Sequence, residues 1–174
     1  MRTLMWTLVL TLTLGLTLGS NVSAADHQQN IVQTAIAVNS EGPYAGQFDT
    51  LIAAVLAADP VVLETLSGNG KFTVFAPTDG AFEALGLTPE NVGTVDQDFL
   101  TEVLLYHVAR GERLASDVTT SQRIRSLQGT FFFPNNSAVI TDAVGRESNI
   151  IVTDVLASNG VIHAIDAVLL PFLP

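Results

Sequence analysis

The order of apolar and polar positions predicts helices in the first half of the chain. Phe48, Leu51, Ile52, Val55 and Leu56 follow the spacing i, i+3, i+4, i+7 and i+8, which places one apolar stripe along a helix. Further helices are predicted at 30–38, at 59–66 behind an Asp-Pro start, around 81–85 and at 96–106. A loop is expected at 39–46, and a β-rich strand at 71–76.

The pattern changes after His107, where short β-rich runs replace the helical spacing. Six strands are expected at 108–114, 123–127, 130–133, 138–141, 150–155 and 161–169, most of them separated by Gly, Asn or Pro. Helices followed by strands indicate an α+β domain, with helices packed against a largely antiparallel sheet system. In the last strand His163 shares the mostly apolar odd-numbered face, and Asp166 lies on the other face.

The first 24 residues are typical of a secretory signal peptide. Arg2 gives a basic start, residues 4–18 are apolar apart from Thr and Gly, and 22–24 (VSA) resemble a cleavage site. A transmembrane anchor is the alternative, but the apolar run of about 15 residues is shorter than the roughly 20 that a span needs. We therefore expect residues 25–174 to form one domain, with a core at about 30–171, outside the cytosol or in a periplasm.

Composition excludes several classes of function. The chain has 7 Lys and Arg against 17 Asp and Glu, a net charge of −10, and no Cys. The acidic balance argues against nucleic acid as a partner, and it predicts weak binding to anionic polymers unless divalent cations bridge. The absence of Cys removes disulfides, thiolate metal sites and Cys nucleophiles.

Catalytic motifs are also missing from the sequence. His27, His107 and His163 are the only histidines, and there is no His-Glu-x-x-His, Gly-x-Ser-x-Gly or phosphate-binding glycine loop. We expect no enzymatic activity, no cofactor and no metal site. A serine–histidine–acid site assembled from distant positions stays open, because such sites are recognised by geometry.

Three segments resemble the signatures of the fasciclin I domain, in that family's order and at fitting separations. They are 73–82 (TVFAPTDGAF), 104–108 (LLYHV) and 159–166 (NGVIHAID). The resemblance covers about residues 30–171. The signature residues, which we expect to be mainly structural, are Thr73, Phe75, Ala76, Pro77, Thr78, Asp79, Phe82, Gly160, Val161, His163 and Asp166. The resemblance implies a wedge of two packed β-sheets with several short α-helices on one side.

The same resemblance suggests two candidate contact sites. Tyr106 and His107 match the family's Tyr-His motif, and Asp154 with Val155 matches an Asp-Ile element that some animal relatives use toward integrins. His107 ends a predicted helix, where a cation is favoured by the dipole, and an exposed Asp154 at a strand end suits a partner-bound cation. The alternatives are that Tyr106 and His107 pack the core and that Asp154 is a solvated turn residue. Asp79 is expected to cap the helix that follows it.

These observations together predict a secreted, non-enzymatic binding module for cell adhesion. Its expected partners are cell-surface or matrix proteins or polysaccharides, with divalent cations as a possible bridge. One alternative is a self-associating envelope protein in which 131–133 (FFF) contributes an exposed apolar edge. A second alternative is a hydrolase that depends on His107.

Overall fold

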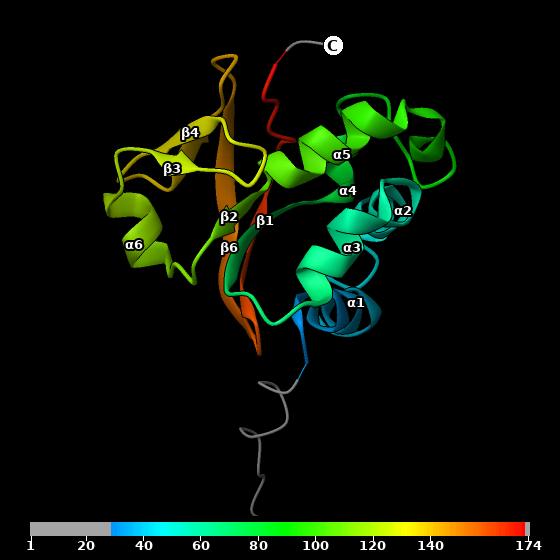
Figure 1. Ribbon diagram of the computed structural model, residues 1–174, viewed down its shortest axis with the longest axis horizontal. Coiled ribbons are helices and arrows are strands. Elements are labelled where there is room, and N and C mark those ends of the chain that lie inside the picture. Colours follow the sequence, from blue (N-terminus) through cyan, green and yellow to red (C-terminus); the bar gives the residue numbers. More distant parts are fainter. Residues whose placement is uncertain (1–28, 173–174) are drawn as a thin grey trace, which may run out of the picture.

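The computed structural model describes residues 29–172, so the predicted signal peptide at 1–24 lies outside the described residues. Five helices and a 3₁₀ turn cover one side of a β-sheet (Figure 1). They are α1 (Ile31–Ser40), α2 (Asp49–Ala57), α3 (Pro60–Ser67), α4 (Asp79–Glu83), η2 (Val92–Thr94) and α5 (Gln97–Tyr106). A further helix, α6 (Ala115–Thr120), lies at the opposite end of the molecule, beside β3 and β4.

Seven strands form the sheet in the order β2-β1-β7-β6-β5-β4-β3. Their bounds are β1 (Phe72–Pro77), β2 (Val108–Arg110), β3 (Ile124–Arg125), β4 (Phe131–Pro134), β5 (Val139–Thr141), β6 (Glu147–Ala157) and β7 (Gly160–Ile165). Only β1 and β7 pair in parallel, with Phe75 beside His163, and every other named pair is antiparallel. An antiparallel bridge between Ala109 and Ser126 brings the two ends of this order together. The α+β class is confirmed. The two packed β-sheets that were expected are the two ends of one continuous seven-stranded sheet.

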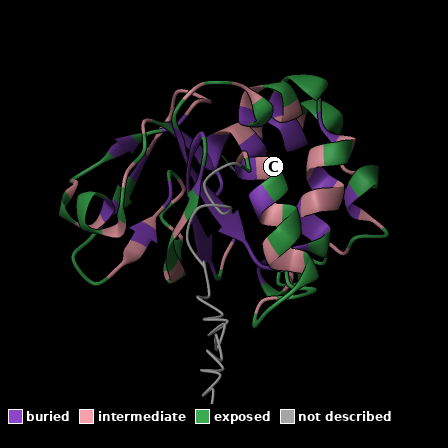
Figure 2. Ribbon diagram, turned by 90° about the horizontal axis from the view of Figure 1, so that it is seen from below, coloured by how far each residue is buried: buried purple, intermediate pink, exposed green. Residues whose placement is uncertain are grey.

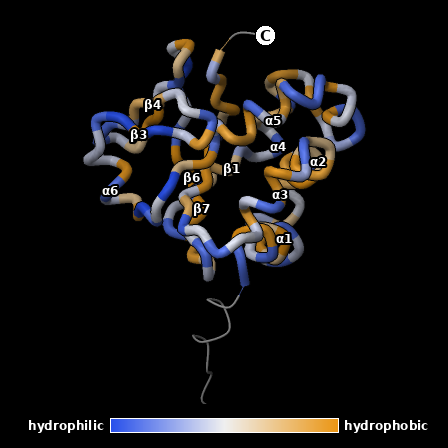
Figure 3. Tube along the Cα trace, viewed as in Figure 1, coloured by the Kyte–Doolittle hydropathy of each residue, from blue (hydrophilic) through white to orange (hydrophobic). Residues whose placement is uncertain are grey.

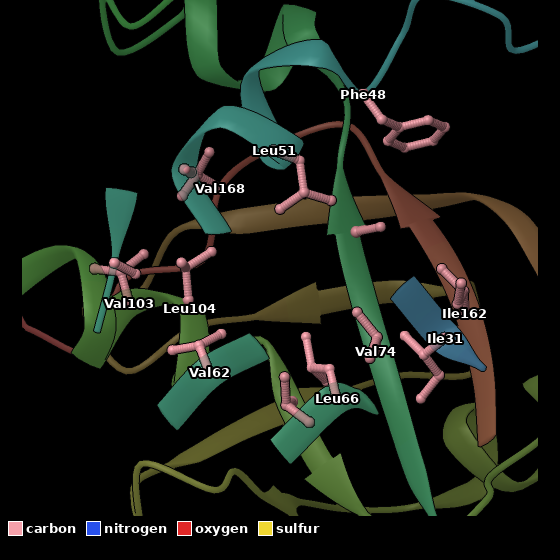
Figure 4. Close-up of a cluster of buried hydrophobic side chains, with 14 of the residues drawn as sticks. Ile31, Phe48, Leu51, Val62, Leu66, Val74, Val103, Leu104, Ile162 and Val168 are labelled. Atoms are coloured by element: carbon pink, nitrogen blue, oxygen red, sulfur yellow. The ribbon is translucent and has the colours of Figure 1, made fainter. Parts of the chain in front are cut away.

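Two hydrophobic clusters lie on opposite faces of the central strands, which are buried throughout (Figure 2). The larger cluster fills the space between the helices and the sheet, where Leu51, Val62, Val74 and Ile162 point toward one another (Figure 4). The smaller cluster lies inside the wedge and contains Phe75, Tyr106, Phe132, Ile140 and Ile165. Because β1 and β7 serve both clusters, they hold the two layers together.

The predicted helix starts are confirmed by their caps. The Asn30 side chain accepts from the Gln33 amide at the start of α1. Asp59 accepts from the Val61 amide at 2.8 Å, and Asp96 accepts from the Phe99 amide at 3.0 Å. These short polar side chains satisfy amides that have no partner within the helix.

The apolar stripe of α2 divides between the core and an apolar cleft. Leu51 is buried, whereas Leu56 is 71% exposed and Ile52 and Val55 are half-buried. The stripe lines a cleft of about 140 Å³ between α1, α2 and α3, with Ile36 on α1 also exposed at 46%. Figure 3 shows hydrophobic positions on these helices as well as on the strands of the sheet. Helical spacing therefore located the helix, but not the share of its apolar face that the core covers.

One expectation and one alternative for the second half of the chain are wrong. The run 108–114 is a strand only at Val108–Arg110, and the helix α6 that follows was not predicted. The strand expected at 130–133 is present as β4, but the exposed apolar edge that the envelope alternative places at 131–133 does not form, because β4 pairs with β3 and β5 on its two sides. Phe132 is buried, Arg123 lies 4.7 Å from the ring centre of Phe131, and only Phe133, at 46%, is well exposed.

Among residues 29–172 no single helix is long and apolar enough to cross a membrane. By length and composition alone, the bent pair α2 and α3 passes the same test.

Candidate functional site

Tyr106 is a core residue at the end of α5. Its side chain is fully buried, its hydroxyl donates to the Phe131 carbonyl at 2.9 Å, and it accepts from the Ala143 amide at 2.9 Å. Burial raises the pKa of Tyr106 to about 12. The phenol thus ties α5 to β4 and to the turn after β5, and it offers no surface to a partner.

His107 is also buried, at 2% exposure, and both ring nitrogens are engaged. Nδ1 lies 2.7 Å from the Val103 carbonyl, and Nε2 accepts from the Leu169 amide at 2.9 Å. This arrangement requires the neutral imidazole with its hydrogen on Nδ1, because an amide N–H needs an acceptor. Burial lowers the pKa of His107 to about 4. The prediction that His107 is a cation at the helix end is therefore wrong, since desolvation outweighs the attraction of the helix dipole.

His163 forms a second histidine network on β7. Its Nδ1 accepts from the Asp154 amide at 3.2 Å, and its Nε2 lies 2.9 Å from the Arg113 carbonyl, to which it donates. Burial lowers the pKa of His163 below its ordinary value. Neither His107 nor His163 contacts a hydroxyl side chain by hydrogen bond. Within residues 29–172 these two histidines provide no nucleophile–base pair for the hydrolase alternative.

Asp154 is the exposed member of the predicted site residues. It lies within β6, where the pairing with β7 shifts between Val152 and Val155, and not at a strand end as expected. Its φ of 59° is unusual for a non-glycine residue and suits Asp better than most. One carboxylate oxygen accepts from the Ala115 amide at 2.8 Å, at the start of α6. Val155 is half-buried and packs against the larger core cluster.

Asp79 caps a different helix from the one that was expected. The residue before α4 is Thr78, and Asp79 is already the first residue of that helix. Its carboxylate instead accepts from the Thr50 amide at 2.8 Å and from the Asp49 amide at 3.3 Å, at the start of α2. A carboxylate is favoured there by the helix dipole. Asp79 therefore joins two helices that are 30 positions apart in sequence.

The remaining signature residues form hydrogen bonds within the fold or are buried. Thr73 accepts from the Arg113 amide and donates to the Gly111 carbonyl, at 2.9 and 2.7 Å. Asp166 accepts from the backbone and side-chain nitrogens of Asn149, both at 2.7 Å. The other members are buried: Phe75, Ala76, Pro77, Thr78, Phe82, Gly160, Val161 and His163.

Two buried polar residues were not singled out from the sequence. Asn159 accepts from the Ile31 amide and donates to the carbonyls of Leu66 and Gly68, which joins the start of α1 to the end of α3. Asp142 is 2% exposed and its carboxylate accepts from the amides of Val144, Arg146 and Leu170. The sequence did contain a signal for both residues: Asn159 lies in a Ser-Asn-Gly turn and Asp142 in an Asp-Ala-Val-Gly turn. Asn and Asp side chains in turns form hydrogen bonds with nearby backbone.

No metal centre is assembled by the part of the chain that is described. Between residues 29 and 172, no three His, Asp or Glu residues are grouped closely enough to hold an ion.

Comparison with known proteins agrees with this architecture. The fasciclin domain model matches residues 46–171. "Protein sll1483" of Synechocystis sp. is 40% identical over 159 residues, covering 86% of this chain and 77% of that protein. The cell surface glycolipoprotein MPB83 of Mycobacterium bovis is 28% identical, covering 86% of this chain and 64% of the relative. A solved pair of FAS1 domains from the insect cell adhesion molecule fasciclin I superposes with a TM-score of 0.62 at 19% identity, covering 83% of this chain and 51% of that one.

The wedge-shaped sheet with its helical layer has the FAS1 fold. The chain belongs to the fasciclin domain family.

Proposed function

We propose that this chain is a secreted module that attaches to cell-surface or extracellular-matrix macromolecules without catalysing a reaction. Membership of the fasciclin domain family carries the proposal, because one relative is named for the cell surface and the fold neighbour for cell adhesion. The signal-peptide pattern at 1–24 supports export.

Asp154 is the contact residue that we favour. Tyr106 and His107 are buried, whereas Asp154 is exposed and its backbone is held by His163 and its side chain by Ala115. A fixed, exposed carboxylate loses little conformational entropy on binding, and it suits a cation held by a partner. Tyr106 and His107 contribute by positioning the sheet.

Binding to cells tests this function. Labelled protein is incubated with intact cells and envelope fractions before and after protease, glycosidase and chelator treatment. Saturable binding is expected, and the treatment that removes it identifies a protein partner, a polysaccharide partner or a bridging divalent cation. If no fraction binds the protein saturably, the proposed function is wrong.

A self-associating envelope role remains the second candidate. The exposed apolar side chains Ile36 and Leu56 beside the cleft favour it. Sedimentation at rising concentration distinguishes the two roles, because the binding module stays monomeric while a self-associating protein does not.

A further inference from the structure

Three of the seven basic side chains of this acidic chain line one hollow. Arg110, Arg113 and Arg125 surround about 390 Å³ of space together with Ser126, Leu127 and Gly129, and no carboxylate residue lines it. We call this site the arginine hollow. It concentrates positive charge in a molecule whose net charge is −10.

The arginine hollow lies at the seam where the two ends of the sheet meet. The antiparallel bridge between Ala109 and Ser126 joins β2 to the residue after β3 (Figure 1). Continuing that register by one residue places Arg110 opposite Arg125. Two like charges directly opposite each other destabilise a strand pair. The fold therefore carries an unfavourable charge pair that an anion would relieve.

The guanidinium group of Arg125 is held by backbone, and no acidic side chain in the described part of the chain pairs with the arginines of the hollow. Arg125 donates from Nε to the Gly129 carbonyl at 3.1 Å, which fixes its orientation on the loop. The ion pair found within residues 29–172 is Lys71 with Glu112, at 2.9 Å. None of the three arginines in the hollow has a carboxylate within 4.0 Å among those residues.

Arg113 supplies a separate indication of a missing acceptor. Its Nε is buried and has no hydrogen-bond partner. Leaving a buried donor unsatisfied destabilises the fold, and more so when the donor belongs to a charged group. A small rotation of the Arg113 side chain toward the hollow would let a ligand oxygen satisfy this donor.

We propose that the arginine hollow binds a tetrahedral oxyanion, a phosphate or sulfate group carried as a monoester. Guanidinium groups bind such anions through paired, charge-assisted hydrogen bonds. The space exceeds what one oxyanion occupies, so the molecule that carries it fits beside Leu127 and Gly129. This site goes beyond the proposed adhesion and does not depend on it.

Titration followed by amide NMR tests the proposal. The probes are inorganic phosphate, inorganic sulfate, glucose 6-phosphate and glucose 6-sulfate, with glucose as the neutral control and ionic strength held constant. Saturable shifts are expected at Ser126 and Gly129 with the anions and not with glucose. The tighter of the two esters identifies the oxyanion. If no probe gives saturable shifts at these amides, the proposal is wrong.

Charge-matched variants separate a built site from general attraction. Arg110→Gln and Arg125→Gln each remove one exposed guanidinium and are expected to raise the dissociation constant by about tenfold or more, equal to the loss of one charged hydrogen bond. Arg146→Gln makes the same charge change outside the hollow and should alter it less than about twofold. Equal weakening in all three variants overturns the proposal. Arg113→Lys keeps the charge but removes Nε, and unchanged affinity in that variant contradicts the role of Nε.

Discussion

His107 shows how burial of one side chain makes stability depend on pH. Its folded pKa is about 4, below the ordinary 6.5, so the unfolded chain binds a proton that the folded chain excludes between these values. Stability is therefore expected to fall as pH drops from about 6.5 to 4, by about 3 kcal/mol from this residue. The lowered pKa of His163 acts in the same direction. Urea unfolding at a series of pH values measures the change.

A variant and a spectrum isolate this residue. His107→Gln removes the titrating group, and the loss of stability over the same pH range should become smaller even if the variant starts less stable. Nitrogen-15 shifts of the imidazole should report the neutral form with hydrogen on Nδ1 at pH 5.5. A protonated His107 at that pH contradicts the account.

Gly160 is required because two strands approach closely at its Cα. A Cβ there would lie 2.0 Å from the Phe72 carbonyl oxygen, and φ is +154°. Gly160→Ala is expected to destabilise the protein by about 3 kcal/mol or more. Gly145→Ala serves as the control, because φ is +85° but nothing lies within 4 Å; its cost should be about 1 kcal/mol. Similar thermal stability of the two variants argues against this role.

Residue identity was easier to predict from the sequence than residue environment. The signature segments marked Tyr106, His107 and Gly160, yet burial of the first two depends on β4 and on residues near 169, far along the chain. Whether Asp154 lies at a strand end or at a bulge depends on the register of β6 against β7. Local spacing carries neither kind of information.

At the scale of elements, Asp79 couples α4 to α2. Its carboxylate is the acceptor for two amides at the start of α2, so Asp79→Ala is expected to cost about 1–2 kcal/mol, as the loss of a helix cap does. Glu83→Ala removes an exposed carboxylate on the same helix and should cost less than about 0.5 kcal/mol. Chemical denaturation compares them, and an unchanged midpoint for Asp79→Ala contradicts the cap.

The boundaries of helices and strands were predicted correctly where a strong local signal in the sequence marks them. Asp59 was predicted as a cap because the side chain and the amide it binds are neighbours in sequence, and the helix predicted at 96–106 proves to be capped in the same way by Asp96. The helix α6 was missed because its start is not marked by a strong cap: Leu114 precedes it, and Asp154 accepts from the Ala115 amide across 39 positions. The strand predicted at 108–114 was too long, because the content of apolar and β-branched residues does not show where hydrogen-bonded pairing with β1 ends.

In the whole molecule, the residues that hold the wedge together differ from those that we propose contact a partner. Tyr106, His107 and Asn159 join layers from within, whereas Asp154 and the arginine hollow face solvent. The class of fold was predictable because three signature segments and the order of helices and strands agreed. The arginine hollow was not, because Arg110, Arg113 and Arg125 meet only when the sheet closes at Ala109 and Ser126.

The most direct test of the central claim is saturation binding to intact cells by two variants measured side by side. Asp154→Asn keeps a residue that tolerates positive φ and removes the exposed charge, and Asp98→Asn is its charge-matched control. Tyr106→Phe removes two buried hydrogen bonds and should lower stability by about 1–3 kcal/mol. The account predicts that Asp154→Asn loses binding while remaining stable, and that Tyr106→Phe, once shown to be folded, still binds. Full binding by Asp154→Asn together with loss in folded Tyr106→Phe would contradict it.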